Sequence, residues 1–304
     1  MQILILGAGS RTAAALIPMI LEETEADVTL VSRHAILSDD PRITSIEADI
    51  TDRATLKDIV MSTLPDVVVN LAAMTHVDRC EVDRSECWSL NVTLVENITR
   101  FCRATDAHLI HFSTDYIFDG LRGPYAEDDT PNPISYYGKA KLAGENVVTS
   151  SGVDATIIRT NVVYGPSPDH PDFVLYVLHS IDHGKPVNAA GDQYSNPTYV
   201  DDIAEATIRI IRKRRTGVYH VGGRDYLSRY EFACIVAETF KLPTTLINNV
   251  TTESLALPAR RPLRGGLICT KAEADLGMQF MGVSSGLITL RHKLFQRTAP
   301  PGNR

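Results

Sequence analysis

The chain has 304 residues, of which 44% are hydrophobic and 22% charged, the profile of an ordinary soluble globular protein. Its formal net charge of −7 disfavours nucleic-acid binding through phosphate contacts, and no apolar stretch reaches the roughly 18 residues that a membrane span requires. The five scattered cysteines form no C-x-x-C pair, and the apolar run at residues 1–6 is too short for a signal peptide. We therefore expect a cytoplasmic protein with reduced thiols and with no membrane or nucleic-acid partner.

Short apolar runs alternate with helical patterns over the first half of the chain. Strands are predicted for residues 3–6, 28–31, 43–48, 66–71, 108–112 and 155–159. Helices are predicted near residues 12–23, 52–62, 86–105, 134–150 and 201–214. The alternation predicts an α/β fold, a doubly wound parallel Rossmann sheet with right-handed crossovers.

The pattern loosens after about residue 165, where proline, glycine and irregular stretches are more frequent. We expect a Rossmann domain over residues 1–165. Residues 166–304 are expected to form a smaller C-terminal substrate-binding lobe, interleaved with returns to the sheet. Ligands of such sheets bind beyond the carboxyl ends of the strands, and several polar or small residues of this chain fall there.

A glycine turn follows the first predicted strand and opens the first predicted helix. Backbone N–H groups in such a turn, together with the positive end of the helix, suit the pyrophosphate of a dinucleotide. The candidate residues are Gly7, Gly9, Ser10, Arg11 and Thr12. A plain strand-to-helix turn is the alternative, and the strand–turn–helix–strand context favours the binding site.

The second predicted strand ends in Ser32 and Arg33. A protein that binds plain NAD usually carries Asp or Glu at this point, where the acid accepts a hydrogen bond from the ribose 2′-hydroxyl. A guanidinium can bind a 2′-phosphate through two hydrogen bonds, and Arg11 could assist from the glycine turn. We expect NADPH to be preferred and NADH to be possible, with a merely solvated Arg33 as the alternative.

Tyr137 and Lys141 are four residues apart in a predicted helix, so their side chains lie on one face, one turn apart. A nearby ammonium favours the phenolate and lowers the pKa of a tyrosine from its usual value of about 10. Such a pair suits proton donation to a carbonyl oxygen as hydride arrives at its carbon. Thr114 follows a predicted strand and could hold the same oxygen. An ordinary exposed helix pair is the alternative.

Longer blocks extend these motifs. They lie at residues 70–81, 113–120, 137–145 and 159–165, with shorter ones at 196–198, 217–221 and 261–262. In this order they resemble the extended short-chain dehydrogenase/reductase superfamily and, within it, the dTDP-4-dehydrorhamnose reductase family of dTDP-rhamnose biosynthesis. The resemblance implies an NAD(P)H-dependent oxidoreductase that reduces a 4-keto nucleotide sugar. It also implies the roles of three residues: Tyr137 donates the proton, Lys141 holds the cofactor ribose, and Thr114 orients the carbonyl oxygen.

The resemblance implies further site residues on both sides of the reaction centre. Those expected along the cofactor are Asp49 and Ile50 near the adenine, Ala72 and Ala73 against the cofactor, and Asn91, whose carbonyl supports the active site. Those expected along the substrate are Thr75, Val77, Thr114, Asn161, Val162 and Arg261. The basic stretch around Arg261 could grip a diphosphate or could equally be a solvated loop.

One position departs from the family's pattern. Val162 replaces the family's tryptophan, which removes a large apolar wall and a stacking surface beside the sugar ring. We therefore expect a wider pocket, with weaker turnover of dTDP-4-dehydrorhamnose than of another keto sugar.

Two other functions stay open at this point. One is a non-catalytic, NADP-binding regulatory subunit resembling the beta subunit of methionine adenosyltransferase, and the other is a nucleotide-sugar epimerase or dehydratase. The intact Thr114, Tyr137 and Lys141 favour the reductase. The histidines show no metal spacing, so no metal site is predicted. The oligomeric state stays open, and a homodimer is one option.

Overall fold

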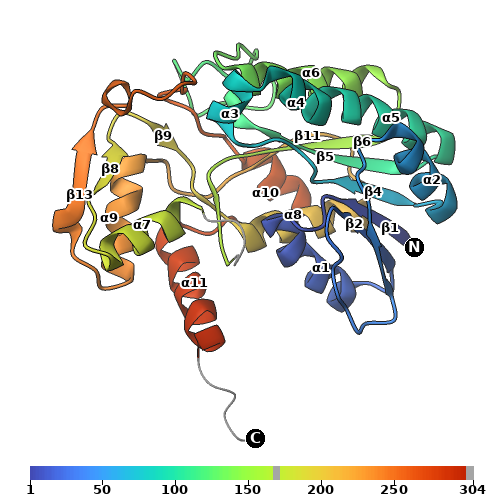
Figure 1. Cartoon of the computed structure of the whole chain (residues 1–304), viewed down its shortest axis with the longest axis horizontal. Coiled ribbons are helices and arrows are strands. Elements are labelled where there is room, and N and C mark those ends of the chain that lie inside the picture. The colour runs from blue at the N-terminus through green and yellow to red at the C-terminus, as the bar shows by residue number, and fades with distance from the viewer. Residues whose placement is uncertain (167–171, 299–304) are drawn as a thin grey trace, which may run out of the picture.

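The computed structural model describes residues 1–166 and 172–298, and a seven-stranded sheet lies at its centre. The strands are β1 (Gln2–Leu6), β2 (Asp27–Ser32), β3 (Ile43–Glu47), β4 (Val67–Asn70), β5 (His108–Thr114), β6 (Ala155–Thr160) and β11 (Gly217–Val221). They are parallel, in the order β11–β6–β5–β4–β1–β2–β3 (Figure 1). Because the strand order reverses at β1, the predicted doubly wound Rossmann fold is confirmed.

The strand β1 illustrates why the apolar runs become central strands. Ile3 and Ile5 pack into the core on one face of the sheet, whereas Leu4 and Leu6 pack into the core on the other, and all four are fully buried. Successive side chains of a strand point to opposite faces, so a strand that is covered on both sides is apolar throughout. Burial of each such side chain contributes roughly 1.5–3 kcal/mol.

Helices cover both faces of the sheet (Figure 1). One face carries α1 (Arg11–Glu23), α8 (Val200–Lys213) and α10 (Thr270–Leu276). The other carries α2 (Arg53–Thr63), α5 (Leu94–Thr105) and α6 (Tyr136–Ser150). The helix predicted over residues 86–105 starts earlier and is divided. It consists of α3 (Val77–Val82), α4 (Arg84–Trp88), a π-helical turn (Ser89–Thr93) and α5.

Side-chain caps determine where the helices that face the site begin. The Ser10 hydroxyl accepts a hydrogen bond from the Ala13 N–H at the start of α1, and the Ser135 hydroxyl accepts one from the Gly138 N–H at the start of α6. Each such cap is worth about 1 kcal/mol. At α6, the Glu81 carboxylate also accepts the Tyr136 N–H at 2.7 Å. Two side chains therefore satisfy the first N–H groups of the helix that carries Tyr137.

A smaller lobe follows β6, built around a third hydrophobic cluster. Its short strands pair as β7 (Val163–Tyr164) with β10 (Thr198–Tyr199), β8 (Val187–Ala190) with β13 (Ile247–Val250), and β9 (Tyr194–Ser195) with β12 (Leu227–Ser228). Its helices are α7 (Phe173–Asp182), α9 (Arg229–Thr239) and α11 (Val283–Thr298). The boundary at residue 165 stays a prediction, since α8, β11 and α10 return to the sheet.

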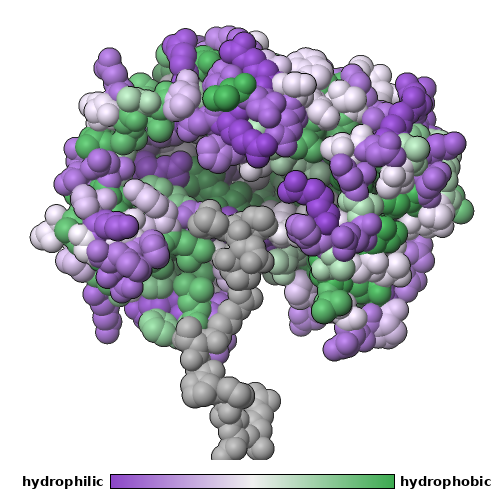
Figure 2. Space-filling model, viewed as in Figure 1, coloured by the Kyte–Doolittle hydropathy of each residue, from purple (hydrophilic) through white to green (hydrophobic). Residues whose placement is uncertain are grey.

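The surface seen in Figure 2 is hollowed between the sheet and the smaller lobe, and apolar side chains are visible in the hollow. Across residues 1–166 and 172–298, no helix is both long and apolar enough to cross a membrane. All five cysteines are free thiols.

Candidate active site

The three predicted catalytic residues come together at the carboxyl end of β5. Thr114 is the last residue of β5, while Tyr137 and Lys141 lie on the first two turns of α6, and all three side chains are buried. The Lys141 ammonium donates a hydrogen bond to the Phe112 carbonyl oxygen at 2.6 Å, which ties α6 to β5. The Thr114 hydroxyl is close enough to the Tyr137 phenol to affect its pKa through a hydrogen bond.

Burial controls the ionisation of both residues of the pair. Burial is the largest influence on Tyr137 and raises its pKa, and the hydrogen bond with Thr114 only partly opposes this effect. Burial also lowers the pKa of Lys141 to about 8, against the opposing charge of Glu145. The sequence predicts a tyrosine pKa lowered by Lys141, but in the structure burial dominates and the phenol is protonated at neutral pH. A protonated phenol is the form that donates a proton to a carbonyl oxygen.

The glycine turn lies beside the ends of β1, β2 and β4. Gly7 has a φ of +81°, and a Cβ there would lie 2.7 Å from the Ala72 nitrogen, so the position requires glycine. A Cβ at Gly9 would come no closer than 4.0 Å to its nearest described neighbour, the Ser32 Cβ. Ser10 has a φ of −76° and therefore needs no glycine. Backbone N–H groups at the N-terminus of α1, which follows this turn, suit phosphate.

Arg33 and Asp49 lie at the same edge of the sheet. Arg33 is exposed just after β2, and its charge helps lower the pKa of Asp49, although hydrogen bonds from Thr51 lower it more. Ile50 is buried in the core beneath them. Arg33 thus presents a guanidinium where the ribose of a dinucleotide would end.

The Arg11 side chain points toward the smaller lobe. Its guanidinium lies 3.4 Å from the Asp172 carboxylate and donates a hydrogen bond to the Val163 carbonyl oxygen at 3.5 Å. Both partners lie on the side of the smaller lobe. Assistance from Arg11 to Arg33 stays a prediction, as does a role for Thr12, in the first turn of α1.

Asn91 lies in the π-helical turn that packs against α6. Its main-chain oxygen would be 2.5 Å from a Cβ at Gly144, one turn beyond Lys141, so only glycine allows this approach. Its side-chain amide donates to the Met74 carbonyl oxygen at 3.1 Å and thereby holds the segment that includes Ala72 and Ala73. The structure thus places the Asn91 carbonyl next to the helix of the catalytic pair.

The predicted substrate residues lie on two sides of the site. Thr75 is exposed, and Val77 is partly buried where α3 begins. Arg261 forms an ion pair with Asp78 at 2.7 Å, with both side chains mostly buried. This pair joins α3 to the C-terminal region across 183 residues of sequence. Arg261 is therefore held in place and is not a solvated loop residue.

A cavity of about 230 Å³ adjoins Arg261 in the smaller lobe. The guanidinium of Arg229 stacks over the ring of Phe173, 4.7 Å from its centre, and burial lowers the pKa of Arg229. Gln193 donates a hydrogen bond to the Tyr116 hydroxyl at 3.5 Å, and the Tyr116 ring packs edge-on against Tyr137. The lining residues are Phe173, Asn188, Ala190, Gln193, Arg229, Leu255, Leu257 and Arg261. Except for Arg261, sequence reasoning missed them, because they lie on separate short elements with no motif spacing.

Asn161 and Val162 follow β6. The Asn161 side chain donates to the Asp115 carboxylate at 3.0 Å and accepts from the Thr198 hydroxyl at 3.3 Å. Val162 is partly buried, has a φ of +40°, and packs against the cluster of the smaller lobe. A β-branched residue at positive φ is a backbone outlier, and such strain gathers at functional sites.

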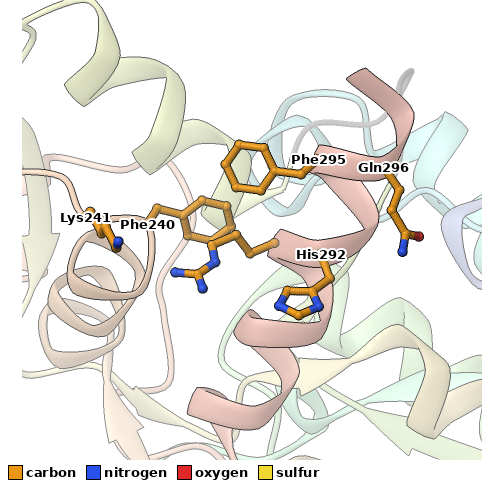
Figure 3. A pocket seen from close by; sticks show the side chains of 6 residues that line it. Phe240, Lys241, His292, Phe295 and Gln296 are labelled. Atoms are coloured by element: carbon orange, nitrogen blue, oxygen red, sulfur yellow. The ribbon is translucent and has the colours of Figure 1, made fainter. Parts of the chain in front are cut away.

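A second groove, of about 450 Å³, lies between the end of α9 and α11 (Figure 3). It is lined by Phe240, Lys241, Arg291, His292, Phe295 and Gln296, none of which belongs to the site around Tyr137. Although this groove is larger, the buried acid/base group lies elsewhere. Within residues 1–166 and 172–298, no group of three or more His, Cys, Asp or Glu side chains is placed to hold a metal ion.

The fold and the buried group of Thr114, Tyr137 and Lys141 define an α/β protein of the extended short-chain dehydrogenase/reductase class. Residues 1–292 match the family described as RmlD substrate binding domain, and the chain belongs to this family. The predicted family membership is confirmed.

Relatives of two kinds are similar to the chain. A dTDP-4-dehydrorhamnose reductase of Sinorhizobium fredii is 33% identical over 242 residues, covering 76% of this chain and 81% of the relative. Methionine adenosyltransferase 2 subunit beta of Xenopus tropicalis is 31% identical over 232 residues, covering 74% and 69%. The crystal structure of dTDP-4-dehydrorhamnose reductase from Bacillus anthracis in complex with NADP superposes with a TM-score of 0.85 at 25% identity, covering 96% of this chain and 99% of that one.

Proposed function

We propose that this protein is an NADPH-dependent reductase of a 4-keto nucleotide sugar. The observation that carries the proposal is the buried phenol of Tyr137, whose pKa burial raises, beside Thr114 and one helical turn from Lys141. The reductases among the relatives support it, since they share the family and most of the chain length.

The residues of this chain have separate tasks in the reaction. When bound, NADPH supplies the hydride that reduces the keto carbon. The Tyr137 phenol gives its proton to the keto oxygen, and the Thr114 hydroxyl donates a hydrogen bond to the same oxygen. Lys141, held by the Phe112 carbonyl, holds the cofactor ribose and restrains the position of Tyr137 on α6.

The preference for NADPH rests on Arg33. Gly7, Gly9 and the N-terminus of α1 form a turn that suits a pyrophosphate, and Arg33 follows at the next strand end. The related reductase from Bacillus anthracis is in complex with NADP, which supports the same choice here. NADH remains a possible second cofactor.

The cavity next to Arg261 suits the nucleotide part of the substrate. Arg229 and Arg261 supply positive charge for a diphosphate, and Phe173, Leu255 and Leu257 supply apolar surface. The sugar would then extend past Tyr116 toward Tyr137, whose ring Tyr116 contacts. A homodimer and a cytoplasmic location stay predictions.

Removal of the Tyr137 hydroxyl tests the function. Tyr137→Phe should lower turnover on the order of 10²–10⁴-fold, the usual contribution of a general acid, while NADPH binding stays nearly unchanged. Single-turnover oxidation of NADPH with a panel of nucleotide keto sugars measures the first, and a fluorescence titration measures the second. Tyr136→Phe is the matched control, because it removes the same oxygen from the neighbouring residue of α6. Full activity of Tyr137→Phe would refute the catalytic assignment.

A regulatory subunit is the second candidate, and the similarity to methionine adenosyltransferase 2 subunit beta favours it. Such a protein would bind NADPH, oxidise it with none of the keto sugars tested, and be indifferent to changes at Thr114, Tyr137 and Lys141. An epimerase or dehydratase ranks below both, since Thr114 is followed by Asp115 and Tyr116 instead of the acidic pair of a dehydratase.

A further inference from the structure

We propose that Asp115 is a positioning residue that acts through Thr114, and that its neutral carboxyl turns the Thr114 hydroxyl toward the keto oxygen of the substrate. The inference rests on the proposed reductase activity. Asp115 follows Thr114 directly, in a short 3-10 turn (Asp115–Ile117), and its side chain is almost completely buried.

The hydrogen-bond capacity of Thr114 carries the argument. A hydroxyl has one proton to donate and two lone pairs to accept with. The Thr114 oxygen accepts the Tyr116 N–H at 3.2 Å, which uses one lone pair, and lies 3.3 Å from Oδ1 of Asp115. An ionised Asp115 can only accept, so it would take the Thr114 proton away from the substrate. A neutral Asp115 donates into the second lone pair and leaves the Thr114 proton for the side of Tyr137. Without substrate that proton can go to the Tyr137 oxygen, and with substrate bound it can go to the keto oxygen.

The other oxygen of Asp115 shows which one carries the proton. Oδ2 accepts the Asn161 side-chain amide at 3.0 Å and the Gly266 N–H at 3.1 Å. With two donors aimed at Oδ2, the proton of a neutral carboxyl belongs on Oδ1, which faces Thr114. The backbone around Gly266 also approaches Oδ2 closely, since a Cβ at the neighbouring Gly265 would lie 2.9 Å from this oxygen.

The surroundings of Asp115 favour the neutral form. Burial is the largest influence and raises the pKa of this carboxyl, against hydrogen bonds from its neighbours and the charge of Arg229 on α9. The other titratable groups that face it are the phenols of Tyr116, Tyr137 and Tyr226, and burial raises the pKa of each of them as well. The carboxyl therefore lies among uncharged phenols, and the charge of Arg229 opposes its neutral form.

Asp115→Asn provides the sharpest test, because its amide has the shape of the neutral carboxyl. The amide oxygen can accept from Asn161 and Gly266, and the amide nitrogen then donates to Thr114 at every pH. We expect Asp115→Asn to keep most of the parent kcat. Asp115→Ala, which removes the donor, should lose on the order of tenfold to a hundredfold in kcat. A loss in Asp115→Asn as large as in Asp115→Ala would overturn the proposal.

The pH profile separates positioning from a purely structural role. The neutral form is the active one, so the parent kcat should fall as the pH rises through the raised pKa of Asp115, and Asp115→Asn should lack this step. Asp119→Asn is the control, because that carboxylate contacts Tyr125 and Asn132 instead of Thr114 and its pKa is lowered. A step that persists unchanged in Asp115→Asn would contradict the inference.

Two further measurements keep the test independent of folding and of the proposed function. In a Thr114→Val background, Asp115→Ala should cause no further loss of kcat, since Asp115 acts through Thr114. Infrared difference spectra of the parent minus Asp115→Asn should show the carbonyl stretch of a neutral carboxyl at neutral pH, whether or not the protein turns over a sugar. An ionised Asp115 at neutral pH would sink this inference alone, whereas a parent that reduces no keto sugar would sink the reductase assignment.

Discussion

Arg33 is a single residue whose charge we expect to favour NADPH over NADH. It is exposed after β2, where the 2′-phosphate of NADPH would lie, and it replaces the acid of NAD-binding proteins. Arg33→Ala should weaken NADPH binding about tenfold or more, because a hydrogen bond to a charged group is worth roughly 1.5–3 kcal/mol, and should change NADH binding little. Fluorescence titrations with both cofactors measure this. Arg100→Ala, at an exposed arginine on α5, is the control, and equal affinities of the parent for both cofactors would contradict the prediction.

Val162 is a second residue that we expect to influence specificity. It follows Asn161 at the position where the motif of the reductase family is expected to carry tryptophan. We predict weak turnover of dTDP-4-dehydrorhamnose by the parent compared with another keto sugar, and a shift toward dTDP-4-dehydrorhamnose in Val162→Trp. The backbone should accept tryptophan, since a β-branched residue is the costlier choice at a φ of +40°.

Steady-state kinetics with both sugars for the parent and for Val162→Trp tests this prediction. Leu178→Met, in the same hydrophobic cluster but on α7, is a control for general repacking of the lobe. Efficient use of dTDP-4-dehydrorhamnose by the parent would show that the missing aromatic ring has no effect.

At the scale of elements, the contact between α6 and the π-helical turn holds the catalytic pair in place. A Cβ at Gly144 would lie 2.5 Å from the Asn91 oxygen and 3.6 Å from Nε2 of His111, so Gly144→Ala must push α6 away. We expect a destabilisation of about 1–3 kcal/mol, as for other overpacked sites, together with a reduced kcat. Thermal unfolding and single-turnover kinetics measure the two effects.

Gly152→Ala is the matched control for this change. Gly152 lies just beyond α6 at a φ of +71°, where a Cβ would meet no described atom within 4 Å, so alanine there reports backbone strain alone. Its melting temperature should fall modestly and its kcat should not change. Equal kcat values for Gly144→Ala and the parent would show that the approach of the two helices does not position Tyr137.

All strands of the sheet except β11 could be predicted from the sequence, whereas the strands of the lobe could not. Strands such as β1 are buried on both faces, so burial leaves a continuous apolar run that can be recognised. The lobe strands β7, β9, β10 and β12 have two residues each, too few to show a period. The π-helical turn at Ser89–Thr93 also left no signal, because one extra residue in a turn hardly disturbs the surrounding hydrophobic pattern.

The candidate site could also be predicted from the sequence only in part. Thr114, Tyr137 and Lys141 lie at fixed spacings around one strand end and one helix, so their motif could be recognised. Arg229 is brought to the site by tertiary packing alone. The motif block at 137–145 contains a structural residue beside the catalytic pair. Its Glu145 forms a buried ion pair with Arg159 at 2.8 Å that joins α6 to β6.

At the scale of the whole molecule, the site is formed where chain segments from both halves meet. Asp78 pairs with Arg261, Asp115 accepts from Gly266, and the His220 N–H donates to the Glu127 carboxylate. Each of these contacts joins the region before residue 165 to the region after it. Movement of the segment that carries Arg261 and Gly266 relative to the sheet would therefore disturb the environment of Thr114 directly.

Because the chain returns to the sheet, two such proteins could not exchange substrate specificity by recombination at a single point. After β6 the chain builds part of the lobe, comes back through α8 and β11, and leaves again before α10 packs on the same face as α1. A chimera with a single crossover near residue 165 would pair β11 and α8 of one parent with β6 and α1 of the other. Transplanting the lobe alone calls for three separate segments: one before α8, one between β11 and α10, and α11 after α10. Recombination between relatives would preserve the sheet only when all three are exchanged together.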